Sequence, residues 1–402
     1  MIEANFSLPP EDYAMMDFHL SPLEVFTKWY QNVHGYASSI LCALSILGNS
    51  LNILILPQKH MRSPTNLLLV VLSGVNIIMM AIYLLYSMNY WVIYVNTCFL
   101  QTLSWTIFAW IHLNVISTMR HVGTWLTLAI AMMRVDLLQF KLTESAAFRR
   151  ARIHIALCLI IVPLFHLPSY ITQGIVWYPL SPVCQMQLNY TELVPYVGPS
   201  YFSVKYNFLP LKLSFWLQGV AFQILPCLLN TIWMFLLIYT LCASKQRRKR
   251  LVKNRTSKYI ERVRLNYAVR ISVVLVVLLA AFLLTELPNG ILCVLSATEG
   301  QKWMNILLTL NEVDELLLIL RSLVVFVFYV VLSSQYRETV TTMWHNCLGR
   351  LRAARKLSRS VRLGEYFVKR RSFSLTSFGQ TTLKQDSLCD TICFDSKEDI
   401  LL

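Results

Sequence analysis

The sequence predicts an all-α membrane protein, a bundle of seven transmembrane helices, and three observations lead to this prediction. Of the 402 residues, 56% are hydrophobic and only 14% are charged, unlike a soluble globular domain. The apolar runs reach the ~20 residues that a ~30 Å hydrocarbon core requires. Between two of these runs, residues 245–264 contain ten Lys or Arg in twenty positions. Basic loops stay on the cytoplasmic side, so this segment orients the chain.

Each predicted span follows from its boundaries. The first comes after an acidic leading segment, and a short basic turn separates it from the second. The third runs without an acid as far as Arg134, and the fourth follows a connection that carries Arg149, Arg150 and Arg152. The fifth and sixth flank the basic segment, and the seventh ends before Ser333. The predicted spans are residues 33–56, 66–90, 103–135, 153–176, 213–242, 265–295 and 306–332.

An odd number of spans places the two ends of the chain on opposite sides of the membrane. Residues 1–32 hold one Lys against five acids, which is expected of an extracellular segment. Residues 334–349 are predicted to form an amphipathic helix on the membrane, and residues 350–402 a disordered cytoplasmic tail. No cleaved signal peptide is recognisable, so the first span is expected to direct insertion. The expected location is the plasma membrane, with multiple passes.

Cysteines and sequons fit this orientation. Cys98 and Cys184 fall in the predicted extracellular connections, where an oxidising environment allows a disulfide, and two unpaired thiols are the alternative. Glycosylation sequons at Asn5 and Asn189 fall on the same side. Cys347, at the end of the predicted amphipathic helix, is a palmitoylation candidate, with an ordinary reduced thiol as the alternative.

Short motifs give a specific resemblance. The strings are Met-Arg-Ser-Pro-Thr-Asn from Met61, Leu-Pro-Cys from Leu225 and Thr-Glu-Leu-Pro-Asn-Gly from Thr285. In order and spacing, residues 48–337 resemble a rhodopsin-like G-protein-coupled receptor, and more narrowly the invertebrate FMRFamide, myosuppressin and sex-peptide receptor group. The resemblance implies an amidated neuropeptide as the extracellular ligand and a heterotrimeric G protein as the partner inside.

The resemblance also implies residues for coupling to the G protein. Arg134, at the inner end of the third span, would contact the G protein, together with Tyr329 and the basic residues Arg248 and Lys249. Receptors of this kind hold that arginine with an acid before it, but here Met133 precedes it. Asp136, two residues on, is a possible substitute partner. The off-state is therefore held in another way, or basal signalling is raised.

Other predicted switch residues lie in the middle of the spans. Pro226 and Pro288 remove backbone donors and should kink the fifth and sixth spans, although such kinks can also serve static packing. Asn76 stands where the resemblance implies an Asp, so no sodium ion is expected. Arg321 brings a cation into the same region, where it would bond Asn76 or a nearby acid, or else face a water-filled cavity.

Acidic residues in the spans are the predicted ligand-binding groups, because a carboxylate suits the guanidinium of an Arg-Phe-amide peptide. For acids at the start of the seventh span, solvation at a helix N-terminus is the alternative. Aromatic residues of the upper third and fifth spans are weaker candidates, because such stripes more often serve packing. The predicted contacts are Glu286, Glu312, Asp314, Glu315, Trp110, His112 and Trp216.

Several function classes are disfavoured. No metal-spaced cluster, phosphate-binding Gly loop or catalytic triad is present in the sequence, which argues against an enzyme and leaves no expected cofactor or metal. The net charge of +15 fits the inner membrane surface and its lipids rather than nucleic acid. Ser and Thr clusters in the tail suit phosphorylation and arrestin. A peptide-binding protein that does not signal, and a transporter or channel, remain as alternatives.

Overall fold

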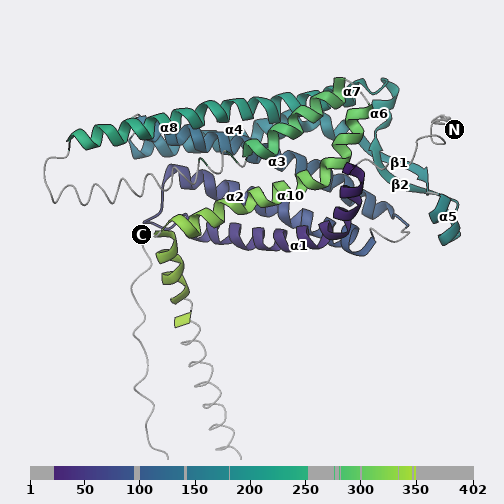
Figure 1. Ribbon diagram of the computed structural model, residues 1–402, viewed down its shortest axis with the longest axis horizontal. Helices are drawn as coiled ribbons and strands as arrows, with labels where there is room; N and C mark the ends of the chain where they lie inside the picture. The colour runs from purple at the N-terminus through teal and green to yellow at the C-terminus, as the bar shows by residue number, and fades with distance from the viewer. Residues whose placement is uncertain are drawn as a thin grey trace, which may run out of the picture. The chain divides into compact units, whose positions relative to one another are not determined.

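The computed structural model describes residues 22–94, 100–139, 143–180, 182–251, 276, 280, 282–298, 301–333, 335–345 and 348–349. The chain divides into two compact units, Met1–Val340 and Thr341–Leu402. The first unit contains the helical bundle (Figure 1). In the second unit, the described residues 341–345 and 348–349 are helical.

The first four predicted spans are helical; α1 packs on α2, and α2 and α4 both pack on α3. Ser63 caps α2, because its hydroxyl accepts from the Asn66 amide, and Pro64 occupies the first turn, where no amide donor is needed. α3 contacts α2, α4 and α8 and is the central helix among the described elements. The observed bounds are α1 (Pro22–Ile55), α2 (Pro64–Ser87), the π-helix η1 (Met88–Tyr94), α3 (Leu103–Gln139) and α4 (Glu144–Thr172).

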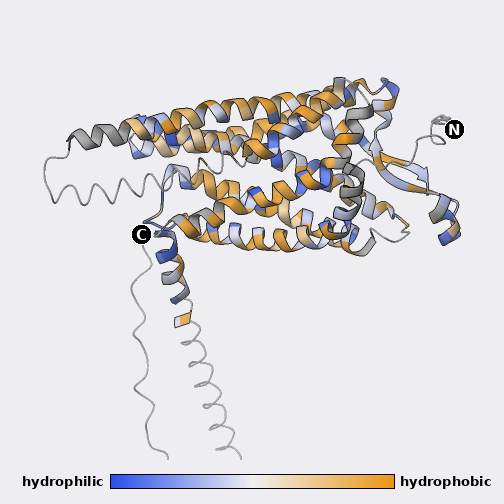
Figure 2. Ribbon diagram, viewed as in Figure 1, coloured by the Kyte–Doolittle hydropathy of each residue, from blue (hydrophilic) through white to orange (hydrophobic). Residues whose placement is uncertain are grey.

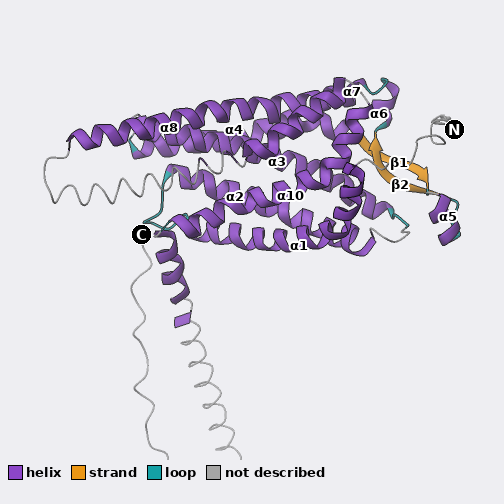
Figure 3. Ribbon diagram, in the orientation of Figure 1, coloured by secondary structure: helices purple, strands orange, loops and turns teal. Residues whose placement is uncertain are grey.

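A β-hairpin lies after the fourth span, and the sequence did not predict it (Figure 3). The expected span through residue 176 was wrong at its end, because α4 stops at Thr172 and β1 (Gln173–Pro179) begins at the next residue. β1 pairs antiparallel with β2 (Leu193–Pro199), and α5 (Pro182–Leu188) lies between them. The Thr106 hydroxyl of α3 donates to the Pro195 carbonyl at 3.0 Å and anchors the strand.

The fifth predicted span is a continuous helix made of three consecutive segments. They are α7 (Leu209–Leu217), the π-helix η2 (Gln218–Ile224) and α8 (Leu225–Leu251), and α6 (Tyr201–Lys205) precedes them. Pro226 lies in the first turn of α8, directly after the π-helix. Proline has no backbone N–H, and the regular α-helical hydrogen bonding is already interrupted at this place. The sequence predicted a kink at this proline, and the departure from α-helix that the structure describes here is the π-helix η2 on its N-terminal side.

The sixth span contains the helix Phe282–Thr298, which comes close to η2 at two glycines. A Cβ at Gly290 would lie 2.8 Å from Gln223 Cβ, and a Cβ at Gly219 would lie 2.8 Å from the Gly290 carbonyl oxygen. Both contacts are shorter than any real Cβ tolerates. The two glycines therefore permit close backbone approach, as small residues do between membrane helices.

The seventh span is α10 (Gln301–Leu332), which packs on α1. Residues 335–345 are again helical. Five described helices are long and apolar enough to cross a membrane. Figure 2 shows hydrophobic residues along the helices, and many of them face outward: Ile160 is 66% exposed and Phe235 64%. Buried polar residues such as Ser45 and Asn49 lie inside the bundle. This distribution suits lipid outside and hydrogen bonding within.

We expect Gly290→Ala to lower the midpoint of thermal unfolding in detergent by several degrees. The added methyl group overpacks the helix crossing, and overpacking typically costs about 1–3 kcal/mol. Gly74→Ala is the matched control, because a Cβ there meets no atom within 4 Å. If both variants melted alike, close packing at Gly290 would not be a determinant of the bundle.

Candidate functional site

Four charged side chains meet inside the bundle, and they form the candidate site. Arg120 comes from α3, Glu286 from the helix Phe282–Thr298, and Asp314 and Arg321 from α10. The side chains are 0% exposed for Glu286, 9% for each arginine and 14% for Asp314. Two positive and two negative groups balance, which makes their burial tolerable. We call these four residues the ion-pair network.

Arg120 is the centre of the network. Its Nε donates to both carboxylate oxygens of Glu286 at 3.0 Å, and its Nη2 donates to Asp314 Oδ1 at 2.9 Å. Its Nη1 bonds the other oxygen of Asp314. One guanidinium thus joins carboxylates on two different helices, which uses its rigid planar fork of donors. α3, the sixth span and α10 are therefore linked through a single side chain.

Arg321 completes the network by pairing with Glu286 from α10. Its Nη1 lies 2.9 Å from Glu286 Oε1, an ion pair whose angles do not meet those of a hydrogen bond. Its guanidinium carbon also lies 5.4 Å from the ring centroid of Phe282, one helical turn before Glu286. Asn76, the other partner expected from the sequence, instead donates to Asn49 Oδ1 at 3.4 Å.

Asn289 adds a neutral group to the network from the sixth span. It lies three residues after Glu286 and so on a similar face of the helix. With its amide oxygen turned toward α3, it accepts from Arg120 Nη1 and Nη2, both at 3.2 Å, and from Gln223 Nε2 at 3.0 Å. We assign this orientation because in the opposite one the amide NH₂ group of Asn289 would face the N–H groups of Arg120 and Gln223. Through Gln223 the network reaches η2.

A second polar cluster lies nearer the end of the bundle that carries the β-hairpin, which we call the hairpin end. Here Gln31 Nε2 donates to Glu312 Oε1 at 2.7 Å, and Asn311 Nδ2 donates to Glu315 Oε1 at 2.8 Å. The Tyr83 hydroxyl donates to Glu315 Oε2 at 2.5 Å. α1, α2 and α10 thus share two carboxylates. The hairpin-end cluster consists of Gln31, His34, Tyr30, Tyr83, Asn311, Glu312 and Glu315.

The hydrogen bonds that link Tyr30, His34, Tyr83 and Glu315 form a chain, in which each group donates to the next one toward Glu315. Because Tyr83 donates its proton to Glu315, it must accept at 2.8 Å from His34 Nε2. A neutral imidazole then accepts at Nδ1, and the Tyr30 hydroxyl lies 3.0 Å from that atom. Burial, with the charges of Glu312 and Glu315, raises the pKa of Tyr30 to about 12, so its proton is retained at neutral pH.

Aromatic rings form a stack beside this cluster. Tyr86 stacks on His112 with ring centroids 4.0 Å apart and on Trp105 at 5.9 Å. His112 is buried, and neither ring nitrogen has a hydrogen-bond partner among the described residues. Trp110 lies elsewhere, since its Nε1 donates to the Gln173 carbonyl of β1 at 3.2 Å. Trp110 therefore joins β1 of the hairpin to α3.

The predicted ligand-binding residues thus fall into separate places. Glu286 and Asp314 share the ion-pair network, and Glu312 and Glu315 belong to the hairpin-end cluster. Trp216 is 46% exposed on the surface of α7. The residue that sequence reasoning missed is Arg120, although a cation in the middle of an apolar span is itself a functional signal.

At the opposite end, the predicted coupling residues are only partly described. Asp136 does not serve as the substitute partner: its Oδ2 accepts from Arg150 Nη1 at 3.2 Å. Gln139 Nε2 donates to Thr240 Oγ1 at 3.0 Å and joins α3 to α8. Arg134 is half-buried on α3. The side chains of Tyr329, Arg248 and Lys249 lie outside the described residues.

The remaining predicted sites have mixed outcomes. Cys184 is disulfide-bonded, but Cys98 lies outside the described residues, so their pairing stays a prediction. Asn189 is exposed in a turn after α5, where glycosylation is sterically possible. Asn5 and Cys347 lie outside the described residues. Pro288 is exposed on the sixth span.

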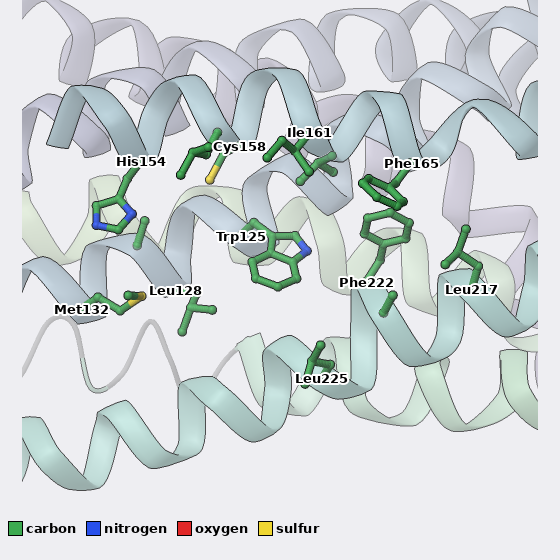
Figure 4. Close-up of a pocket in the computed structure, with 14 residues that line it drawn as sticks. Trp125, Leu128, Met132, His154, Cys158, Ile161, Phe165, Leu217, Phe222 and Leu225 are labelled. Carbon is green, nitrogen blue, oxygen red and sulfur yellow. The ribbon is translucent and has the colours of Figure 1, made fainter. Parts of the chain in front are cut away.

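An apolar cavity of about 390 Å³ lies between α3, α4 and the fifth span (Figure 4). Trp125 and Phe222 form part of its wall, and His154 stands at one end. Phe222 also stacks on His121, the neighbour of Arg120, with ring centroids 4.9 Å apart. The lining holds no carboxylate, Lys or Arg. A charged ligand would therefore find its partners in the ion-pair network and the hairpin-end cluster instead.

We expect Glu286→Gln to lower the free energy of unfolding by about 3–5 kcal/mol, because it leaves two buried arginines without their shared carboxylate. Thermal unfolding in detergent measures this. Asp136→Asn is the matched control, since its pair with Arg150 is largely exposed and worth about 1 kcal/mol or less. Adding Arg321→Met to Glu286→Gln should restore part of the loss. Equal effects of Glu286→Gln and Asp136→Asn would contradict the network.

Comparison with known proteins identifies the family. Residues 36–347 match the family described as serpentine type 7TM GPCR chemoreceptor Srw. The G-protein coupled receptor dmsr-1 of Caenorhabditis elegans is 24% identical over 351 residues, covering 77% of this chain and 68% of that protein. The sex peptide receptor of Drosophila melanogaster is 26% identical over 367 residues, covering 84% and 77%.

Structural comparison agrees with this assignment at the level of the fold. Squid rhodopsin superposes with a TM-score of 0.56 at 16% identity, over 82% of this chain and 88% of the rhodopsin chain. Together with the family match, this confirms the predicted seven-transmembrane fold. The chain belongs to the Srw family of serpentine seven-transmembrane G-protein-coupled receptors.

Proposed function

We propose that this receptor binds an amidated neuropeptide of the FMRFamide or myosuppressin type at the hairpin end and activates a heterotrimeric G protein at the opposite end. In this proposal the hairpin end faces the outside of the plasma membrane and the C-terminus lies in the cytoplasm. The observation that carries it is the ion-pair network, which links three helices and whose Asp314 is the neighbour in sequence of Glu315 in the hairpin-end cluster. The relatives named as a sex peptide receptor and a G-protein coupled receptor support it.

The carboxylates suit a cationic peptide. Glu312, Asp314 and Glu315 lie within four residues of α10, and Asp314 retains 14% exposure of its side chain. A peptide guanidinium would meet these groups first and would compete with Arg120 for Asp314. An amidated C-terminus is neutral, whereas a free carboxylate would be repelled by the same acids. Amidation is therefore part of the proposed specificity.

Glu286 has a different proposed role from the direct ligand contact predicted from the sequence. Its side chain is 0% exposed and is already paired with Arg120 and Arg321. A ligand that draws Asp314 away leaves Arg120 to depend on Glu286 alone. The helix Phe282–Thr298, which carries Glu286 and Pro288, would then shift relative to α3. We propose Glu286 as a positioning residue of this switch.

The inner end supports coupling with an unusual restraint. Met133 replaces the acid expected before Arg134, and Asp136 is engaged by Arg150. We propose that the ion-pair network contributes to holding the off-state. A receptor that binds peptide without signalling is the second candidate, and the altered sequence around Arg134 is the observation that favours it.

We expect Asp314→Asn to weaken activation by an Arg-Phe-amide peptide about 10- to 100-fold, because a hydrogen bond to a charged group contributes about 1.5–3 kcal/mol. The assay is G-protein activation in cells that express a promiscuous G protein. Glu192→Gln is the matched control, since Glu192 is an exposed carboxylate on the loop before β2. The free-acid form of the peptide should be weaker on the unaltered receptor. Equal potency of Asp314→Asn and Glu192→Gln would contradict the proposed site.

Arg134→Ala should abolish the response while leaving peptide binding within about threefold. The arginine is proposed to contact the G protein, and the peptide binds at the other end. Radiolabelled peptide binding and G-protein activation, both corrected for surface expression, separate these effects. Saturable binding with no activation in the unaltered receptor would instead favour the non-signalling candidate.

A further inference from the structure

We propose that the cavity between the α1–α2 turn and the start of α4 binds the phosphorylated headgroup of an inner-leaflet phosphoinositide. This inference rests on the proposed orientation, in which the end opposite the hairpin is cytoplasmic. The cavity has a volume of about 510 Å³. It is separate from the ion-pair network, which lies deep in the bundle.

Two arginines give the cavity its charge. Arg62 comes from the α1–α2 turn and Arg152 from α4, and both line the cavity. Neither has a carboxylate within 4 Å among the described residues, whereas Arg120, Arg150 and Arg321 all do. No acidic residue is in the lining. Two exposed guanidinium groups that face one space without a carboxylate partner favour an anion, and phosphate oxygens match their donors.

The local structure directs these groups toward the cavity. The guanidinium carbon of Arg62 lies 5.3 Å from the ring centroid of Phe148, a cation–π contact that bridges the turn and α4. On α4, Ser145, Phe148 and Arg152 follow one another at intervals of three and four residues, so they share a helix face. The cavity therefore has a basic side built from two separate segments.

Polar and apolar groups complete an amphiphilic site. Ser63 uses its hydroxyl oxygen to accept from the Asn66 amide, which leaves its proton free to donate to a phosphate. The apolar part of the cavity wall is formed by Leu56, Pro57 and Leu67. That surface fits the glycerol and first methylene groups of a lipid rather than a fully hydrated ion. Basic pockets between helices on the cytoplasmic side are a recurring site for such headgroups.

The test is native mass spectrometry of the full-length receptor with dioctanoyl phosphatidylinositol 4,5-bisphosphate. Arg62→Gln and Arg152→Gln should each reduce affinity about fivefold, and the double variant about 25-fold. Arg149→Gln is the matched control, because it removes the same charge from α4 outside the cavity lining. Ser145→Trp, which fills the cavity and keeps both arginines, should also weaken binding. Thermal unfolding checks that each variant is folded.

Three results would overturn the proposal. Equal losses in Arg149→Gln and Arg62→Gln would indicate diffuse surface charge, and unchanged binding in Ser145→Trp would exclude the cavity. Equally tight binding of free inositol trisphosphate would make a soluble phosphate, rather than a lipid, the ligand. Because binding is measured without G protein or peptide, failure of the proposed receptor function would not produce any of these results.

Discussion

A buried, charge-balanced set of two arginines and two carboxylates is the interaction on which the rest of the structure depends. Charges inside a membrane bundle are tolerated only while they remain paired. Arg120 therefore fixes the position of the sixth span through Glu286 and of α10 through Asp314 at the same time. Any movement of one helix must exchange partners within the set. Such a constraint favours two discrete arrangements over a continuous range, as a switch requires.

The first half of α10 divides its acidic residues between two environments. Residues 312 and 315 are three apart and share a face, while residue 314 points about 200° from residue 312 on a helix of 3.6 residues per turn. Glu312 and Glu315 accordingly bond residues of α1 and α2, and Asp314 bonds Arg120 of α3. A ligand that contacts the acids of one short segment would act on both sides of α10. The geometry thus offers a direct physical route from ligand to switch.

The sequence was sufficient for the fold because span length and the basic loop are local properties. It also identified Glu286, Asp314 and Arg321 as unusual, since each is a charge in an apolar segment. It could not pair them, because partner choice depends on how three helices are rotated. Arg120 was overlooked. Arg321 was expected to bond Asn76 or a nearby acid, and the structure pairs it with the acid Glu286. The hairpin was missed because Ile175 and Val176 extend the apolar run of α4, and because β1 depends on pairing with residues 193–199, whose strand β2 is held by Thr106 of α3.

The central claim is that Arg120 and Asp314 act as one unit that holds α3 against α10. A double-mutant cycle on the free energy of unfolding, with Arg120→Gln, Asp314→Asn and the double variant in detergent, tests this most directly. We expect the single changes to be strongly non-additive, with an interaction energy above about 1 kcal/mol, because each removes the same buried pair. Additivity within about 0.5 kcal/mol would show that the two residues stabilise the receptor independently and would contradict the account.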